Sequence, residues 1–172
     1  TLTFKTAPDR IGSSVVVMRL TEVGISNPRQ SSSKTFTINL APVNDAPVFT
    51  LPPTLDVFED QGLVSISAFA AGIGPGPATA IDEAAQKLTI TTTALDPAAF
   101  TVLPTIDATG RLQFRTRPDF NSSISNLVFT VSVVDDGSSV APNKNQSPTK
   151  TFTINVIPVN DPPTFTLTRS RI

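Results

Sequence analysis

The sequence contains no cysteine, histidine, tryptophan or tyrosine among its 172 residues. Without cysteine and histidine, thiol chemistry, zinc sites of the usual kind and histidine-based general bases are excluded. The formal net charge of −1 gives no electrostatic reason to expect nucleic acid or an anionic membrane as a partner. No apolar run approaches the ~20 residues of a membrane-spanning helix. We therefore expect no membrane span and no nucleic-acid partner.

One long segment of the sequence occurs twice in similar form. The segment KTFTINLAPVNDAPVFTL begins at Lys34, and KTFTINVIPVNDPPTFTL begins at Lys150, an offset of 116 residues. Further upstream, LTFKTAPDR from Leu2 matches LQFRTRPDF from Leu112 at an offset of 110. The six-residue difference falls in stretches rich in Ser, Asn, Pro and Gly, where loops vary in length. The chain is therefore a tandem repeat.

The repeat divides the chain into three parts. Residues 1–47 are the C-terminal part of one repeat, residues 48–163 are a complete repeat, and residues 164–172 are the first strand of a following repeat or a donated strand. The chain begins in mid-pattern at TLTFKT, so we interpret it as a piece of a longer protein. The first part, with three expected strands, is too short to bury a core and needs strands from upstream, from another chain or from the C-terminal strand.

Alternating apolar residues within the complete repeat predict an all-β fold. Leu127, Phe129, Val131 and Val133 share one face of a strand, and similar short patterns occur at Leu55–Phe58, Leu63–Phe69, Leu88–Ile90, Leu112–Phe114 and Phe152–Val156. About seven strands in some 115 residues indicate a Greek-key, immunoglobulin-like β-sandwich. We expect at most one helical turn, near Asp82, and a plain loop at GIGPGPA from Gly72.

Acidic and amide residues fall at the predicted strand ends and in the linkers, where loops of a sandwich meet. Calcium takes six to eight oxygen ligands from such side chains and from backbone carbonyls. The Asn–Asp pairs beside proline are suited to this, because the proline keeps the preceding residue extended. The candidate calcium ligands are Asp9, Asn44, Asp45, Glu59, Asp82, Glu83, Asp119, Asp135, Asn160 and Asp161. The alternative is that Val-Asn-Asp forms a metal-free Asx turn and that Asp135–Gly137 is an ordinary hairpin turn.

The chain resembles the bacterial cadherin-like tandem repeats of large secreted surface proteins. The segments that carry the resemblance are PVNDAP, PVNDPP, VFEDQG, GPATAIDEAAQKLTITTT, TGRLQFRTRPDFNSS and FTVSVVDDG. The resemblance covers the complete repeat and the end of the first. It implies an extracellular or cell-surface location, a cadherin-like sandwich, and calcium between successive modules.

The resemblance also implies a role for each candidate ligand. Glu59 matches a glutamate of the first strand, Asp9 and Asp119 match a strand-end aspartate, and Asp82 with Glu83 matches an acidic pair that receives the ion from the preceding module. Asp135 matches an aspartate before a glycine, and the linker pairs Asn44–Asp45 and Asn160–Asp161 match linker ligands. Several acidic residues of the cadherin pattern are missing here, so we expect weak calcium affinity, around 10⁻⁴ to 10⁻³ M.

Three functions remain open from the sequence. The chain is a structural module of a calcium-stiffened surface protein, a subunit of an extracellular filament assembled by strand donation, or an adhesion module that binds a cell surface or a carbohydrate. Its partners are then neighbouring repeats or identical subunits. We do not expect an enzyme, because no Trp or Tyr is present to line a sugar cleft beside the carboxylates.

Overall fold

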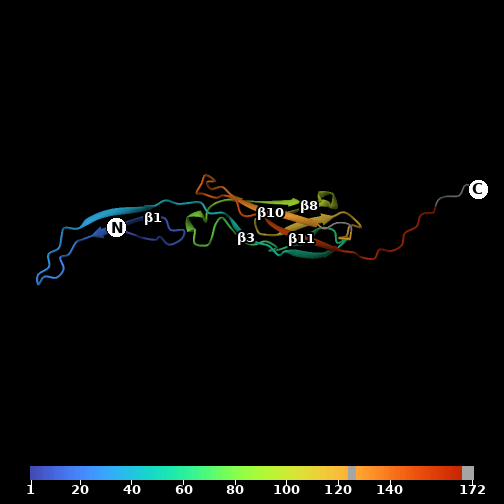
Figure 1. Ribbon diagram of the computed structural model, residues 1–172. Helices are drawn as coiled ribbons and strands as arrows, with labels where there is room; N and C mark the ends of the chain where they lie inside the picture. Colours follow the sequence, from blue (N-terminus) through green and yellow to red (C-terminus); the bar gives the residue numbers. More distant parts are fainter. Residues whose placement is uncertain (124–126, 168–172) are drawn as a thin grey trace, which may run out of the picture.

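The computed structural model describes residues 1–123 and 127–167, and β-strands dominate it. A two-stranded hairpin lies at one end, a β-sandwich in the middle and an extended segment at the other end (Figure 1). Within the described residues the helical elements are two 3-10 turns, η1 (Ile81–Glu83) and η2 (Pro97–Ala99). Neither these turns nor any other described helix has the length and apolar character needed to cross a membrane.

The hairpin consists of β1 (Gly12–Met18) and β2 (Lys34–Leu40). The strands of the second module are β3 (Val48–Thr50), β4 (Thr54–Phe58), β5 (Val64–Ile66), β6 (Ala71–Gly74), β7 (Leu88–Ala94), β8 (Phe100–Ile106), β9 (Leu112–Thr116), β10 (Leu127–Asp135) and β11 (Lys150–Ile157).

The second module is the expected all-β sandwich with Greek-key connections. One sheet has the strand order β4-β11-β10-β7, and the other has the order β5-β9-β8. The chain leaves the first sheet after β7, forms β8 and β9 in the second, and returns to place β10 beside β7. The strand β4 pairs in parallel with β11, and the short pair β3–β6 forms a separate small sheet. This arrangement confirms the predicted fold class.

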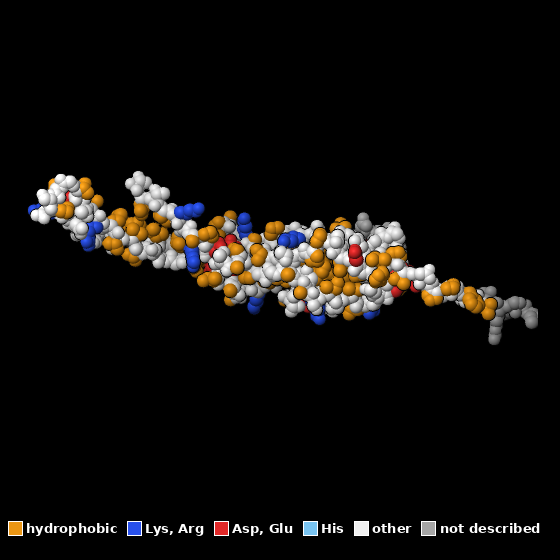
Figure 2. All heavy atoms as spheres, turned by 90° about the horizontal axis from the view of Figure 1, so that it is seen from below, with side chains coloured by type: hydrophobic (Ala, Val, Ile, Leu, Met, Phe, Trp, Pro, Cys, Tyr) orange, Lys and Arg blue, Asp and Glu red, His pale blue; other side chains and the backbone are white. Residues whose placement is uncertain are grey.

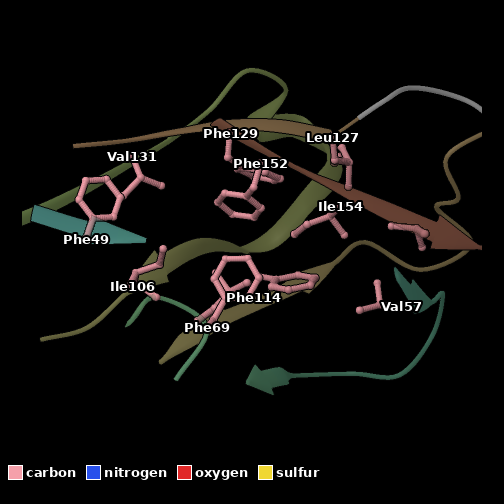
Figure 3. Packing of buried hydrophobic residues seen from close by; sticks show 14 of the residues in the cluster. Phe49, Val57, Phe69, Ile106, Phe114, Leu127, Phe129, Val131, Phe152 and Ile154 are labelled. Atoms are coloured by element: carbon pink, nitrogen blue, oxygen red, sulfur yellow. The ribbon is translucent and has the colours of Figure 1, made fainter. Parts of the chain in front are cut away.

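A phenylalanine cluster fills the space between the sheets. The rings of Phe129 and Phe152 are stacked with centroids 4.8 Å apart, and Phe69 meets Phe152 edge-on at 4.9 Å. Phe100 contacts both Phe129 and Phe114 in edge-on geometry. Figure 3 shows Phe129 and Phe152 facing Phe69 and Phe114 from the opposite layer. Every second residue of β10 is buried, as its alternating pattern predicts.

The two copies of KTFTIN form equivalent strands with different burial. Phe152 and Ile154 on β11 are fully buried, whereas Phe36 and Ile38 on β2 are only partly covered. The difference has a structural cause: a second sheet covers β11, whereas among the described strands β2 pairs only with β1. The first part of the chain therefore forms a hairpin with apolar side chains on its surface.

The prediction of three strands in residues 1–47 is wrong for the described residues. The segment Leu2–Thr6, although it matches β9 in sequence, is not a strand. In the second module β9 pairs with both β5 and β8. No described strand lies beside Leu2–Thr6 to provide these pairings, so its backbone has no ladder to join.

The turn between β8 and β9 is held by one aspartate. The carboxylate of Asp107 accepts hydrogen bonds from the Thr109 hydroxyl (2.6 Å) and from the backbone N–H groups of Thr109 (2.9 Å) and Arg111 (3.1 Å). It also accepts one from Arg111 Nε at 3.0 Å. These bonds, that of the Thr109 hydroxyl above all, lower the pKa of Asp107 from 3.8 to about 2.

We predict that Asp107→Asn lowers the melting temperature at neutral pH and that this difference disappears in acid. Because the folded-state pKa is depressed, the charged carboxylate stabilises the fold above about pH 4, and the contribution is lost as pH falls towards about 2. Thermal melts of both proteins across this range measure the difference, with Asp96→Asn as the control. A difference that stays constant with pH contradicts the prediction.

Candidate metal centres at the two ends of the sandwich

The predicted site residues gather at the two ends of the sandwich. We call the group at the hairpin end the joint cluster: Asp9, Asn44, Asp45, Asp82, Glu83 and Asp135. We call the group at the opposite end the distal cluster: the predicted residues Glu59, Asp119 and Asp161 together with Asp60. The predicted residue Asn160 lies at the same end but outside this cluster. Figure 2 shows acidic side chains where the narrow hairpin meets the wider sandwich. The sequence prediction that distant carboxylates meet at the poles therefore agrees with the geometry.

Local backbone structure places these side chains. Asp82 and Glu83 lie in the 3-10 turn η1, and Asp135 is the last residue of β10. Asp9 and Asp119 have nearly the same left-handed conformation, with φ of 53° and 55°. Aspartate adopts this region more readily than most residues. The equivalent turns in the two repeats therefore share this backbone conformation.

The linker is tied to the second module through Glu83. The backbone N–H of Asp45 donates a hydrogen bond to Glu83 Oε1 at 2.5 Å. The chain passes so close at Gly76 that a Cβ there would lie 2.1 Å from Glu83 Oε2. Glu83 is 3% exposed, and among the described atoms its Oε2 has no hydrogen-bond partner. A buried carboxylate oxygen without a partner is unfavourable.

Like charges accumulate around this carboxylate. Burial, followed by the charges of Asp45, Asp82 and Asp135, raises the pKa of Glu83, although the Asp45 N–H opposes the shift. Burial and the charges of Asp9 and Asp82 likewise raise the pKa of Asp45, and Lys144 only partly offsets them. The joint cluster therefore holds more negative charge than the neighbouring groups balance.

A hollow beside the joint cluster is open to a small ligand. It measures about 440 Å³, and Asp9, Asp45 and Asp82 line it. Asp9 and Asp45 belong to the first repeat and its linker, while Asp82 belongs to the second. A cation in this hollow would therefore contact both modules.

Asn44 lies in the linker but is bonded entirely to the second module. Its side-chain Nδ2 lies 3.0 Å from Asp135 Oδ1, 2.8 Å from the backbone oxygen of Lys144 and 3.3 Å from that of Ser138. Gln86 Nε2 donates a hydrogen bond to Asn44 Oδ1 at 2.5 Å. Asp135 Oδ2 is buried and, among the described atoms, has no hydrogen-bond partner.

The distal cluster brings three carboxylates together. Ligand oxygens of Glu59, Asp60 and Asp161 all lie within 4.8 Å of one another. The backbone N–H of Asp119 donates a hydrogen bond to Asp60 Oδ1 at 3.1 Å. Partial desolvation and then the charges of Asp60, Asp119 and Glu59 raise the pKa of Asp161. This set of oxygens fits a hard cation such as calcium.

Glu59 is buried and links the distal cluster to the second linker. Its Oε1 accepts a hydrogen bond from the backbone N–H of Val159 at 2.7 Å, and its Oε2 accepts one from Asn121 Nδ2 at 3.3 Å. Asn160, in contrast, is exposed and donates only a long hydrogen bond to the backbone oxygen of Asp161. Its side chain is therefore not drawn into the distal cluster.

Sequence reasoning missed several residues of the two clusters. It did not assign Asp60 as a ligand, although its position after Glu59 in VFEDQG is a usable signal. No sequence pattern could have identified Gln86 or the backbone oxygens of Ser138 and Lys144. Thr79, whose hydroxyl donates a hydrogen bond to Asp9 Oδ2, was also missed.

No protein-family model matches the chain, and a search of curated proteins gives no match. Among solved structures, the chain is similar to human mucin-like protocadherin EC1-2, with 17% identity and a TM-score of 0.42, over 83% of this chain and 69% of that one. It is also similar to the human desmocollin-1 ectodomain, with 16% identity and a TM-score of 0.45, over 90% of this chain and 29% of that one. The likeness concerns the fold and extends to no ligand or partner.

Proposed function

We propose that the chain is a structural module of an extracellular tandem-repeat surface protein of the bacterial cadherin-like kind, stiffened by calcium between successive modules. The observation that carries the proposal is the joint cluster. There, carboxylates of two repeats meet in one place, and two buried carboxylate oxygens, Glu83 Oε2 and Asp135 Oδ2, have no hydrogen-bond partner within residues 1–123 and 127–167. The partners of the module are then its neighbouring repeats.

The oxygens of the joint cluster fit calcium better than a transition metal. The chain has no histidine or cysteine, and the cluster offers carboxylates and backbone oxygens. Asp9 and Asp45 would hold the ion from the first repeat, and Asp82, Glu83 and Asp135 from the second. When bound, calcium supplies positive charge that offsets the repulsion among these groups. The linker then loses conformational freedom, because residues of both modules bind the same ion.

We predict that calcium raises the melting temperature of the chain and that removal by chelator reverses the shift. A ligand at ten times its dissociation constant adds about 1.4 kcal/mol of stability. Glu83→Gln and Asp45→Asn remove charge but keep nearly the same shape, so each should abolish most of the shift. Asp96→Asn, outside both clusters, is the control. Equal calcium shifts in wild type and in both cluster variants would place the ion elsewhere.

We predict in addition that calcium narrows the range of angles at the joint. Because the chain has no cysteine, Ser26→Cys on the hairpin and Gln61→Cys on the sandwich accept a pair of spin labels without background. Both positions are exposed. Pulsed dipolar spectroscopy should show a narrower distance distribution with calcium than with chelator. A distribution that calcium leaves unchanged in width would argue against stiffening, even where calcium binds.

A second candidate function is supported by uncovered apolar side chains at both ends. On the hairpin, Val15 and Val17 are 64% and 61% exposed, and in the extended segment Phe165 and Leu167 are 85% and 88% exposed. Donation of this segment to the hairpin of an identical chain would cover both sets and build a filament.

For this second function, we predict that light scattering detects assemblies of increasing mass as the protein is concentrated. Phe165→Ser with Leu167→Ser should then give monomers, because the donated segment loses its apolar anchors. Thr166→Ser between them is the control. A wild-type protein that remains monomeric at high micromolar concentration excludes the filament.

A further inference from the structure

We propose that Asn44 is a metal-independent latch of the joint, in which its amide NH2 group takes the place of a cation among oxygens of the second module. This deepens the proposed function, and rests on it in treating residues 41–47 as a joint between modules. The latch divides the joint cluster into two halves. Hydrogen bonds from Asn44 lock one half permanently, at Asp135 Oδ1, and calcium acts at the other half, around Asp9, Asp45, Asp82, Glu83 and Asp135 Oδ2.

Three oxygens surround the nitrogen of the Asn44 side chain. Asp135 Oδ1, Lys144 O and Ser138 O lie 3.0, 2.8 and 3.3 Å from Nδ2. One of them is a carboxylate oxygen and two are backbone carbonyl oxygens, which is a common ligand set of a hard cation. The NH2 group carries partial positive charge on its hydrogens, and hydrogen bonds to a charged acceptor are the stronger kind.

The orientation of the Asn44 amide is coupled to that of Gln86. Gln86 Nε2 donates to Asn44 Oδ1, so that oxygen is turned towards a donor. Rotating the amide by half a turn would place Oδ1 against the three oxygens, an arrangement that requires a cation between them. The same rotation would set two NH2 groups against each other unless Gln86 rotated too. The two orientations therefore correspond to a latch and to a metal ligand.

The backbone of Asn44 is held as firmly as its side chain. Its N–H donates to Asn143 Oδ1 at 2.7 Å, and its carbonyl oxygen accepts from the backbone N–H of Lys144 at 2.8 Å. The second module also leaves room for the side chain at Gly137. A Cβ at this glycine would lie 2.0 Å from Asn44 Oδ1. A pocket shaped to this degree around one linker residue indicates a binding site for that residue.

The second linker supplies a matched comparison within the same chain. Asn160 stands at the position equivalent to Asn44 but is exposed, and its side chain reaches only the backbone oxygen of Asp161, at 3.4 Å. The two asparagines have the same preceding residues, PV, and the same following residue, Asp. Substitution of Asn160 therefore measures the effect of the same change on stability at a linker asparagine whose side chain is exposed.

The test compares the complete chain with Asn44→Ala, Asn44→Asp, Asn160→Ala and Asn160→Asp in chelator. We expect Asn44→Ala to lower the melting temperature by about 4–8 °C or more, because buried acceptors lose their donor. Asn44→Asp should lower it further, because a carboxylate then faces Asp135 and two carbonyl oxygens. Both Asn160 variants should melt as wild type does. Neutral Asn44 variants in chelator would overturn the latch.

A second measurement on the wild-type protein is independent of whether the variants fold. In chelator, the side-chain NH2 protons of Asn44 should give nuclear magnetic resonance signals protected from solvent exchange, and those of Asn160 should not. Adding calcium should leave the Asn44 signals in place while backbone signals near Asp45 and Glu83 move. Unprotected Asn44 signals, or signals that move with calcium as those of a ligand do, would overturn the proposal. If no signal moves, the calcium proposal fails while the latch stands.

Discussion

The joint depends on the burial of carboxylates of like charge where the linker enters the second module. Glu83 and Asp135 are almost fully enclosed, and Asp45, Asp82 and Asp9 lie close enough to raise the pKa of one or both of Glu83 and Asp45. Lys144 alone acts in the opposite direction on Asp45. Such an arrangement is tolerated only where hydrogen bonds and counter-charges compensate for it. The conformation of the linker depends on which hydrogen bonds or counter-charges offset the burial of each carboxylate.

The compensation takes two forms, one neutral and one ionic. Around Asp135 it comes from neutral donors: Asn44 Nδ2 and the backbone N–H of Gly137 both donate to Oδ1. Around Glu83 the described part of the chain supplies a single N–H donor, from Asp45, and Oε2 has no partner there. A neutral donor binds without regard to ion concentration, whereas a cation site fills only when the ion is present. A joint built from both would keep its position at all times and change its stiffness with calcium.

Much of the fold could be predicted from the sequence, because side-chain alternation reports burial directly. The strands β10 and β11 alternate without interruption and were predicted nearly to their ends. The strand β8 was missed because Pro104 and two register shifts interrupt its pattern. The strand β6 was missed because Ala71–Gly74 contains two glycines and runs into the loop GIGPGPA. Leu2–Thr6 matches a strand in sequence but has no neighbour to pair with, so sequence similarity alone overestimated its structure.

The candidate site was predictable in its location but not in its contacts. Carboxylates at strand ends must lie at the poles of a sandwich, whatever the details of the loops. Which oxygen meets which donor depends on loops of irregular shape. The groups that bind Asn44 include backbone groups of Ser138 and Lys144, and any residue carries those groups. The repeated Asn–Asp pair therefore predicts a binding site in the linker. It does not predict that the asparagine itself forms hydrogen bonds with the second module.

The two ends of the sandwich differ in what faces the linker. The joint cluster is complete because two repeats contribute to it, and there the linker asparagine is enclosed. The distal cluster has the same kinds of residue from one repeat: Glu59, Asp60, Asp119 and Asp161 meet, while Asn160 stays exposed. The two linker asparagines stand in the same local sequence and therefore differ in burial because of what faces them. Residues 137–145, which supply Ser138, Asn143 and Lys144 to the surroundings of Asn44, lie in the stretch where the two copies of the repeat differ in length.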